Sequence, residues 1–299
     1  RDFLLSLTNK YGNTNENIRA FTKAVEEIAK YVDNVRQWYE DKAYPEVMEL
    51  INGKGTIKRG KTTLSIVGKR VTVELQNIDD TKMIEVVIKR PGVHITVPPI
   101  LPERLRLSIM LGLMNSDGHV NMYGHAEMRT VHLWQVILWL LLFPGVNYAK
   151  VDVKLNAKKG VKLLWRLGNL SSFLEQTRPV LDGVINGKVV ISWPLLVFGA
   201  ILGDGYISIR LRHGTKRELT VAVTGKDLSY LPEWLFSSTL DEAVVTYDAR
   251  AASLLRAIYN ELDPILLDIL RFMADNLSDA EKLRRFFKAI NMQFRPRGE

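Results

Sequence analysis

The chain has 299 residues, 46% of them hydrophobic, so it is long enough to bury a large core in two or three domains. Its 41 Lys and Arg residues outnumber its 33 Asp and Glu residues, and the net charge of +8 favours a polyanionic partner without distinguishing DNA from RNA or an anionic membrane. The absence of cysteine excludes disulfides, thiolate catalysis and cysteine-based zinc sites, and none of the five histidines shows a zinc-binding spacing.

Residues 1–100 are expected to form a module of their own. Apolar residues recur at alternating three- and four-residue steps from Ile18 to Tyr39, which predicts a long amphipathic helix. Such a stripe is typical of a core face, and a short coiled-coil seam that dimerises the protein is the alternative. The proline-rich segment 98–102 is a stiff connector and places the module boundary near residue 100. The strand-like runs between helix and connector are Thr62–Val67, Arg70–Leu75, Met83–Lys89 and Val93–Val97.

The most informative feature of the chain is a pattern that occurs twice. Residues 110–118 read MLGLMNSDG, and residues 197–205 read VFGAILGDG. Each is an apolar, helix-like stretch with Gly at its third position and Asp-Gly at its end. A helix whose contact face carries Gly can approach a second helix closely, so Gly112 and Gly199 predict two helices packed backbone to backbone.

The same packing would bring two carboxylates together. Asp117 and Asp204 end the two stretches, and adjacent carboxylates repel each other unless a cation lies between them. Mg²⁺, or Mn²⁺ in its place, suits such a site because it is held by one or two carboxylates, waters and phosphate oxygens. The terminal carbonyls of the helices have no partners within the helix and would add oxygen ligands. Gly118 and Gly205 fit the left-handed residue that commonly closes a helix.

The two stretches resemble the motifs of the LAGLIDADG homing endonucleases, in the single-chain form that carries both motifs, over roughly residues 101 to 290. In that family the acid before the final Gly binds the metal, which implies this role for Asp117 and Asp204. The sixth motif position, usually acidic, is Asn115 in one copy and Leu202 in the other, and this position is generally structural. The residues expected to hold the metal are Asp117, Asp204, Ser116 and Gly203.

The same order of predicted elements follows each motif. The elements expected after Asp117 are strands His119–Gly124 and His125–Val131, helix His132–Phe143, strands Val146–Leu155 and Val161–Leu167, and helix Asn169–Val184. Those expected after Asp204 are strands Tyr206–His213 and Leu219–Lys226, helix Leu228–Ser238, strands Ala243–Asp248 and Ser253–Tyr259, and a helix from Glu261. Both halves read αββαββα. The resemblance therefore implies an α+β fold with pseudo-twofold duplicated LAGLIDADG repeats at 101–190 and 191–299, whose antiparallel sheets bind DNA, beside the helix-and-strand module at 1–100.

Basic side chains alternate with apolar ones on several predicted strands. Because strand side chains point alternately to opposite faces, one face would pack on helices and the other would be basic. A two-stranded ribbon fits the major groove of DNA, where Arg reads guanine and Lys neutralises phosphate. A merely solvated basic face is the alternative. The expected DNA-binding residues are Lys150, Lys154, Lys158, Lys159, Lys162, Arg166, Ser208, Arg210, Arg212, Lys216, Arg217 and Lys226.

The resemblance implies metal-dependent hydrolysis of both strands of a double-stranded DNA site. The metals held by the two aspartates would activate water and stabilise the phosphate charge. The family often places a Lys near each scissile phosphate, and the candidates by distance along the chain are Lys188 and Lys282, with Lys154 and Lys226 on strands as alternatives. Two other functions remain open. One is a non-cutting nucleic-acid binder on the same fold, such as an RNA-splicing maturase or a regulator, and the other is an unrelated α+β structural protein.

The protein is expected to be a monomer with a pseudo-dimeric core that works inside the cell, in the cytoplasm or with its DNA. No signal peptide is visible, so secretion is not expected. The most apolar run, Leu133–Phe143, is shorter than the about 20 residues that a bilayer span needs. We interpret it as the buried helix of the first repeat, and no membrane partner is expected.

Overall fold

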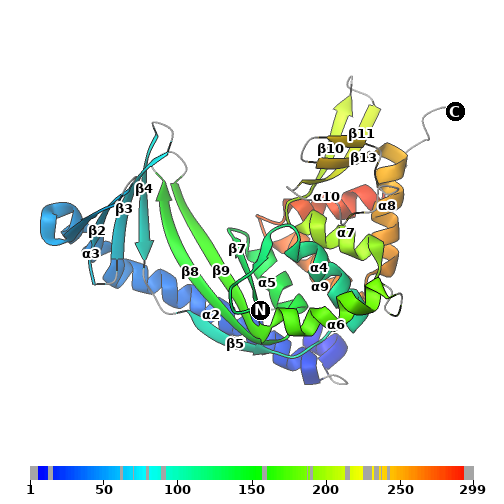
Figure 1. Ribbon diagram of the computed structural model, residues 1–299, viewed down its shortest axis with the longest axis horizontal. Coiled ribbons are helices and arrows are strands. Elements are labelled where there is room, and N and C mark those ends of the chain that lie inside the picture. Colours follow the sequence, from blue (N-terminus) through cyan, green and yellow to red (C-terminus); the bar gives the residue numbers. More distant parts are fainter. Residues whose placement is uncertain are drawn as a thin grey trace. The chain divides into compact units, whose positions relative to one another are not determined.

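A computed structural model of the chain describes residues 6–12, 16–60, 63–69, 71–78, 81–88, 92–156, 160–186, 188, 191–212, 216–224, 231, 236, 238–240 and 243–292. These residues form a mixed α+β structure with antiparallel sheets, which confirms the predicted class (Figure 1). Contacts divide the chain into two compact units. The first unit comprises Arg1–Thr96, Arg129–Val131 and Val146–Gly168, and the second comprises Val97–Met128, His132–Gly145 and Asn169–Glu299.

The first unit contains a long helix, α2 (Glu16–Trp38), which confirms the amphipathic helix predicted there. Its buried face includes Phe21 and Tyr31. The Tyr31 hydroxyl accepts a hydrogen bond of 3.2 Å from the Val151 amide, and its ring lies 6.4 Å from that of Trp165. The apolar stripe of α2 is therefore a core face within its own unit.

Short helical segments lie on both sides of α2, and the sequence analysis did not predict them. They are η1 (Thr8–Gly12), η2 (Tyr39–Ala43), α3 (Tyr44–Glu49) and η3 (Leu50–Lys54). Pro45 lies in the first turn of α3, where a helix needs no amide donor. These segments supply part of a buried apolar cluster with the strands of the same unit. Its members are Ala43, Val47, Leu50, Val71, Val73 and Val153.

The four strand-like runs predicted between the long helix and the connector correspond to strands β2, β3, β4 and β5. Three of them join a further strand, β1, in an antiparallel sheet of order β1-β2-β3-β4. Strand β1 was not predicted. The bounds are β1 (Thr56–Arg59), β2 (Thr63–Val67), β3 (Val71–Ile78) and β4 (Thr81–Ile88), and β5 (Val93–Val97) follows in a second sheet.

The elements around the first motif have the predicted order. They are α4 (Glu103–Met114), β6 (Gly118–Val120), β7 (His125–Thr130), α5 (Leu133–Leu142), β8 (Gly145–Asn156), β9 (Gly160–Ser172) and α6 (Phe173–Ile185). The second sheet has the strand order β5-β8-β9-β7-β6. β6 ends earlier than predicted because a turn follows it, in which the Asn121 side chain accepts a hydrogen bond of 2.9 Å from the Tyr123 amide and Gly124 has a φ of +78°.

The elements around the second motif form a third sheet and a set of helices. They are α7 (Trp193–Leu202), β10 (Tyr206–Arg212), β11 (Lys216–Thr224), β12 (Ser238–Leu240), β13 (Ala243–Tyr247), α8 (Asp248–Glu261), α9 (Pro264–Asn276) and α10 (Glu281–Ile290). The sheet order is β10-β11-β13-β12, and all three pairings are antiparallel. Helix α10 contacts α8, α9 and β10 in the same unit (Figure 1).

One prediction for the second half was wrong. The predicted strand Ser253–Tyr259 lies inside α8, because Ala251, Leu254, Leu255 and Ile258 follow a helical spacing and are all buried. A helix was predicted from Glu261, where α8 ends, and the next helix, α9, begins three residues later at Pro264. The predicted helix Leu228–Ser238 falls mostly outside the described residues, and Ser238 itself begins β12.

The predicted division at residues 100 and 190 stays a prediction. By contacts, the chain from Arg1 to Thr96 groups with most of β8 and β9, and the residues after Asn169 group with both motif helices. All residues of the candidate site lie in the second unit.

Candidate metal centre at two helix ends

The site begins with a close contact between α4 and α7, as the two motif glycines predict. A Cβ added to Gly112 would overlap the Leu196 carbonyl oxygen and come within 2.8 Å of the Ala200 nitrogen. A Cβ added to Gly199 would overlap the Ile109 carbonyl oxygen. The obstacles are backbone atoms in both cases, and they are reciprocal. Glycine is therefore required on both helices, and the predicted backbone-to-backbone packing is confirmed.

The two helices end in different ways. At the end of α4, the Asn115 side chain donates to the Leu111 carbonyl at 2.8 Å, and the Ser116 hydroxyl donates to the Leu113 carbonyl at 3.0 Å. At the end of α7, the Gly203 amide donates to the Gly199 carbonyl at 3.1 Å. Asn115 at the sixth motif position is thus a cap of its own helix. This is consistent with a structural role for that position.

The glycines after the aspartates are not left-handed, so that prediction was wrong. Among the described residues, only Gly53, Gly124 and Gly145 are glycines with positive φ. A Cβ on Gly118 would come within 2.8 Å of the Met114 Cα, and one on Gly205 within 2.7 Å of the Ala222 carbonyl oxygen. Lack of space selects glycine at these two positions.

The carboxyl groups of Asp117 and Asp204 are in hydrogen-bonding contact. The pKa of Asp117 is raised from 3.8 to about 6, mainly by burial and further by the hydrogen bond to Asp204 and the charge of Asp204. A hydrogen bond from Gln135 and the charge of Lys282 act in the opposite direction. Asp117 therefore holds its proton more tightly than an isolated carboxyl would, and a cation near it would favour release of that proton.

Gln135 is a site residue that the sequence analysis missed. It lies on α5 and is 3% exposed, and its Nε2 donates to Asp117 Oδ2 at 2.9 Å and to the Leu202 carbonyl at 3.0 Å. These bonds tie one carboxylate to the end of the opposite helix. A signal was present, because Gln135 is the one strongly polar residue in the apolar helix LWQVILWLLL.

Lys282, on the first turn of α10, is the predicted lysine that lies at the helix ends near the carboxylates. Its Nζ donates to the carbonyls of Leu202, at 3.2 Å, and Gly203, at 2.5 Å. Burial lowers the pKa of Lys282 to about 8, and the negative charges of Asp117 and Asp204 oppose this shift. The ammonium group thus lies at the negative end of α7, where a cation is favoured.

Among the other candidate lysines, only Lys188 has a described side chain. Lys188 follows α6, its side chain is exposed, and its backbone amide donates to the Gly183 carbonyl at 2.7 Å. Lys226 and the side chain of Lys154 lie outside the described residues.

The donor atoms of the site fit a hard cation. Two carboxylates and the nearby carbonyls of Leu202 and Gly203 are all oxygen donors, and Mg²⁺ commonly uses one or two carboxylates together with water and phosphate oxygens. Within the described ranges no cluster of three or more His, Cys, Asp or Glu side chains offers a complete protein cage. The predicted ligand Ser116 directs its hydroxyl to the Gly112 and Leu113 carbonyls, so its side chain serves its own helix.

The predicted DNA-binding residues of the second unit lie on a β-hairpin. Arg210 on β10 is exposed and lies opposite Glu218 of β11, and Ser208 is half-buried on the same strand. The backbones of Arg212 and Lys216 are paired across the hairpin. The side chains that lie outside the described part of this hairpin are those of Arg212, Lys216 and Arg217.

The predicted basic face of the first unit contains a buried acid. Asp152 on β8 is 1% exposed, and it forms ion pairs with Lys150, at 3.5 Å, and with Arg166 of β9. Part of the positive charge of these two side chains is therefore neutralised within the unit. The remaining predicted residues here have side chains outside the described part, namely Lys154, Lys158, Lys159 and Lys162.

Comparison with protein-family models and with curated proteins gave no match for this chain. None of the helices in the described ranges combines the length and the apolar character of a membrane span. The fold and the site place the chain in a structural class. The class is that of α+β proteins in which two closely packed helices bring two carboxyl groups together at their ends.

Proposed function

We propose that the protein is a site-specific endonuclease for double-stranded DNA, of the LAGLIDADG type, that uses a divalent cation held by Asp117 and Asp204. One observation carries the proposal. The two carboxyl groups are in contact at the ends of helices whose glycines interlock reciprocally. Two carboxyl groups that face each other repel when both are ionised and add no stability, so their arrangement favours a functional role.

The order of elements supports a duplicated αββαββα fold. The first half has the order α4-β6-β7-α5-β8-β9-α6, and the second has α7-β10-β11-β12-β13-α8 among its described residues. Residues 225–230 and 232–235, where the second half would carry its middle helix, lie outside the described chain. Each motif helix is followed directly by its aspartate and then by a strand that pairs antiparallel with the next one. Two such halves would give the pseudo-twofold monomer that a nearly palindromic DNA site requires.

The cation would be held by the two aspartates, with water and substrate phosphate oxygens as its other ligands. When bound, Mg²⁺ or Mn²⁺ supplies a water of lowered pKa and stabilises negative charge on the phosphate. Gln135 fixes the orientation of the Asp117 carboxylate through its 2.9 Å hydrogen bond. Lys282 presents an ammonium group that can donate a hydrogen bond to a phosphate oxygen or to the attacking water. Asp117 and Lys282 are half-buried, which strengthens these interactions relative to bulk water.

The net charge of +8 and the exposed Arg210 on the β10–β11 hairpin support DNA as the substrate. An exposed Arg on a two-stranded ribbon can reach a guanine edge or a phosphate in the major groove. RNA attracts the same charge, so the test includes it.

The decisive experiment is a cleavage selection with Mg²⁺. The protein is incubated with a library of randomised duplexes beside the variants Asp117→Asn and Asp204→Asn, and new DNA ends are sequenced. We expect ends at one sequence that decrease by about a hundredfold or more in either variant, while duplex binding persists. Wild-type protein that produces no new ends with Mg²⁺ or Mn²⁺ would refute the proposal.

A second candidate is a non-cutting nucleic-acid binder on the same fold, such as an RNA-splicing maturase or a regulator. Lys282 favours it, since its ammonium group already donates to the helix-end carbonyls of Leu202 and Gly203 and places a positive charge near the carboxylates. In that case the double variant Asp117→Asn/Asp204→Asn would bind duplex DNA or RNA as strongly as the wild type, with the same salt sensitivity. A clear loss of retention would count against it.

A further inference from the structure

Helix α10 begins in an unusual way. Its N-cap is Ala280, which has no side chain that can accept a hydrogen bond from the first turn. This helix lies beyond the predicted αββαββα order and yet carries Lys282 to the site. Phe286, four residues later on the same face, is fully buried, and its ring lies 5.1 Å from that of Phe198 in α7. The first turn of α10 is therefore held in place by contacts other than a side-chain cap.

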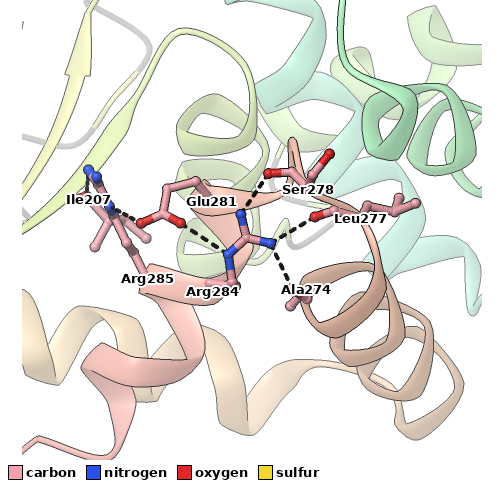
Figure 2. A network of polar contacts seen from close by, with 7 residues as sticks. All are labelled: Ile207, Ala274, Leu277, Ser278, Glu281, Arg284 and Arg285. Atoms are coloured by element: carbon pink, nitrogen blue, oxygen red, sulfur yellow. Dashed lines mark hydrogen bonds and ion pairs between the residues drawn. The ribbon is translucent and has the colours of Figure 1, made fainter.

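Arg284 provides these contacts. Figure 2 shows its guanidinium group between the end of α9 and the first turn of α10. Nη1 donates to the carbonyls of Ala274, at 3.0 Å, and Leu277, at 2.7 Å, and Nη2 donates to that of Ser278 at 2.8 Å. Nε donates to the Glu281 carboxylate at 3.0 Å. One side chain thus joins the open carbonyls of the preceding helix to the residue adjacent to Lys282.

Glu281 extends this network to the strand that follows the second motif. Its carboxylate also accepts a hydrogen bond of 2.9 Å from Arg285, which donates to the Ile207 carbonyl of β10 at 3.2 Å (Figure 2). The hydrogen bond from Arg284, followed by that from Arg285, lowers the pKa of Glu281. Ile207 lies three residues after Asp204. The first turn of α10 is therefore tied to the same segment of chain that presents the second aspartate.

The turn before α10 reaches the other side of the site. The Asp279 carboxylate accepts a hydrogen bond of 2.7 Å from the Leu133 amide at the start of α5, and α5 carries Gln135. Lys282 and Gln135 meet at the Leu202 carbonyl, which accepts a bond from each. The segment from Leu277 to Arg285 thus sets the position of both polar side chains that contact the helix ends.

We infer that Arg284, with Glu281, is a positioning residue for the site, because it fixes the first turn of α10 so that Lys282 reaches the carbonyls of Leu202 and Gly203. The inference rests on the proposed function for its catalytic consequence, but the placement of Lys282 can be measured without cleavage. It predicts that Arg284 acts only through Lys282 and leaves DNA affinity unchanged.

The first test measures the accessibility of Lys282. Metal-free protein is treated with a lysine acylating reagent at constant pH, and the rate of modification at Lys282 is followed by mass spectrometry. Loss of hydrogen bonds to a charged group is enough for about a tenfold faster modification in Arg284→Gln. The matched control is Arg256→Gln, since Arg256 donates to the Met292 carbonyl at the opposite end of α10. We expect no change there.

A control for folding is needed, because Arg284→Gln removes several hydrogen bonds at once. If circular dichroism shows that Arg284→Gln is unfolded, Glu281→Gln takes its place, since Glu281 lies at the surface and forms only the two arginine contacts described. Unchanged protection of Lys282 in the folded variant that is used would overturn the inference.

The second test is a double-mutant cycle on single-turnover cleavage. A misplaced catalytic group costs about tenfold to a hundredfold in rate, so we expect this decrease in Arg284→Gln with an unchanged Kd for DNA. In the Lys282→Met background the same substitution should have no further effect. A further decrease there would overturn the inference. A wild type that cuts no DNA would refute the proposed function, and the acylation test would still decide the placement of Lys282.

Discussion

The Leu202 carbonyl accepts hydrogen bonds from Gln135 and from Lys282, which come from two different helices. Gln135 also holds Asp117, and the charge of Lys282 lowers the pKa of that carboxyl while burial raises it. At the scale of single residues, the site is therefore a balance between the proton held by Asp117 and a nearby ammonium group. A cation that displaces either one would change this balance.

The raised pKa of Asp117 predicts how stability depends on pH. In metal-free protein the folded state binds this proton more tightly than the unfolded state, since the pKa rises from 3.8 to about 6. The resulting stability is fully present below about pH 4 and is lost as the pH rises through about 6. Denaturant unfolding with EDTA, measured across this range, should show a smaller decrease for Asp117→Asn than for the wild type. Parallel curves for the two proteins would contradict the prediction.

At the scale of elements, the contact between α4 and α7 decides where the aspartates meet. Gly112 and Gly199 each face a carbonyl oxygen of the opposite helix, and backbone atoms cannot move aside as a flexible side chain can. The ends of the helices are then brought together by the same contact. This places the site at the best-packed part of the second unit.

Gly112→Ala and Gly199→Ala test this packing. In an exposed helix, Gly to Ala stabilises by up to about 1 kcal/mol. Here the added methyl meets backbone, so we expect a destabilisation of about 1–3 kcal/mol or more, with loss of cleavage. Urea unfolding measures the first effect and the cleavage assay the second. A stabilised variant would show that the helices separate without cost and that the contact is not required.

At the scale of the whole molecule, the excess of positive charge should act on nucleic acid as a salt-dependent attraction. The described structure shows that this charge is not uniformly available, because Asp152 pairs with Lys150 and Arg166. Arg210 on β10 is exposed and forms no ion pair with another residue of the described chain, so it is the better probe of DNA contact.

The salt dependence of binding tests the role of the β10–β11 hairpin. If Arg210 contacts a phosphate, Arg210→Gln should reduce the slope of log K against log salt concentration by about 1. Exposed Arg178 on α6 lies outside the predicted strands, and Arg178→Gln should leave the slope unchanged. Fluorescence anisotropy with a duplex at several salt concentrations measures both. Equal slopes for all three proteins would show that Arg210 of the hairpin does not contact a phosphate.

The local pattern of the sequence was sufficient for much of the fold. The stripe of α2, the alternation in β8 and β10, and the Gly and Asp positions of the two motifs depend on neighbours within a few residues, and the corresponding elements are present. The same local reasoning was wrong at Ser253–Tyr259, because a short apolar run fits both a strand and a helix and only its burial against α7 distinguishes them.

By itself, the sequence determined that two aspartates follow two glycine-bearing helices, since those residues and their spacing are local properties of the chain. The tertiary structure alone decided which other side chains join them. Lys282 and Gln135 are distant from both aspartates along the chain. They reach the site because α10 and α5 carry them to the ends of the two motif helices. Periodicity determines which face of a helix is buried, but the partner that each buried polar group meets depends on how the helices pack together.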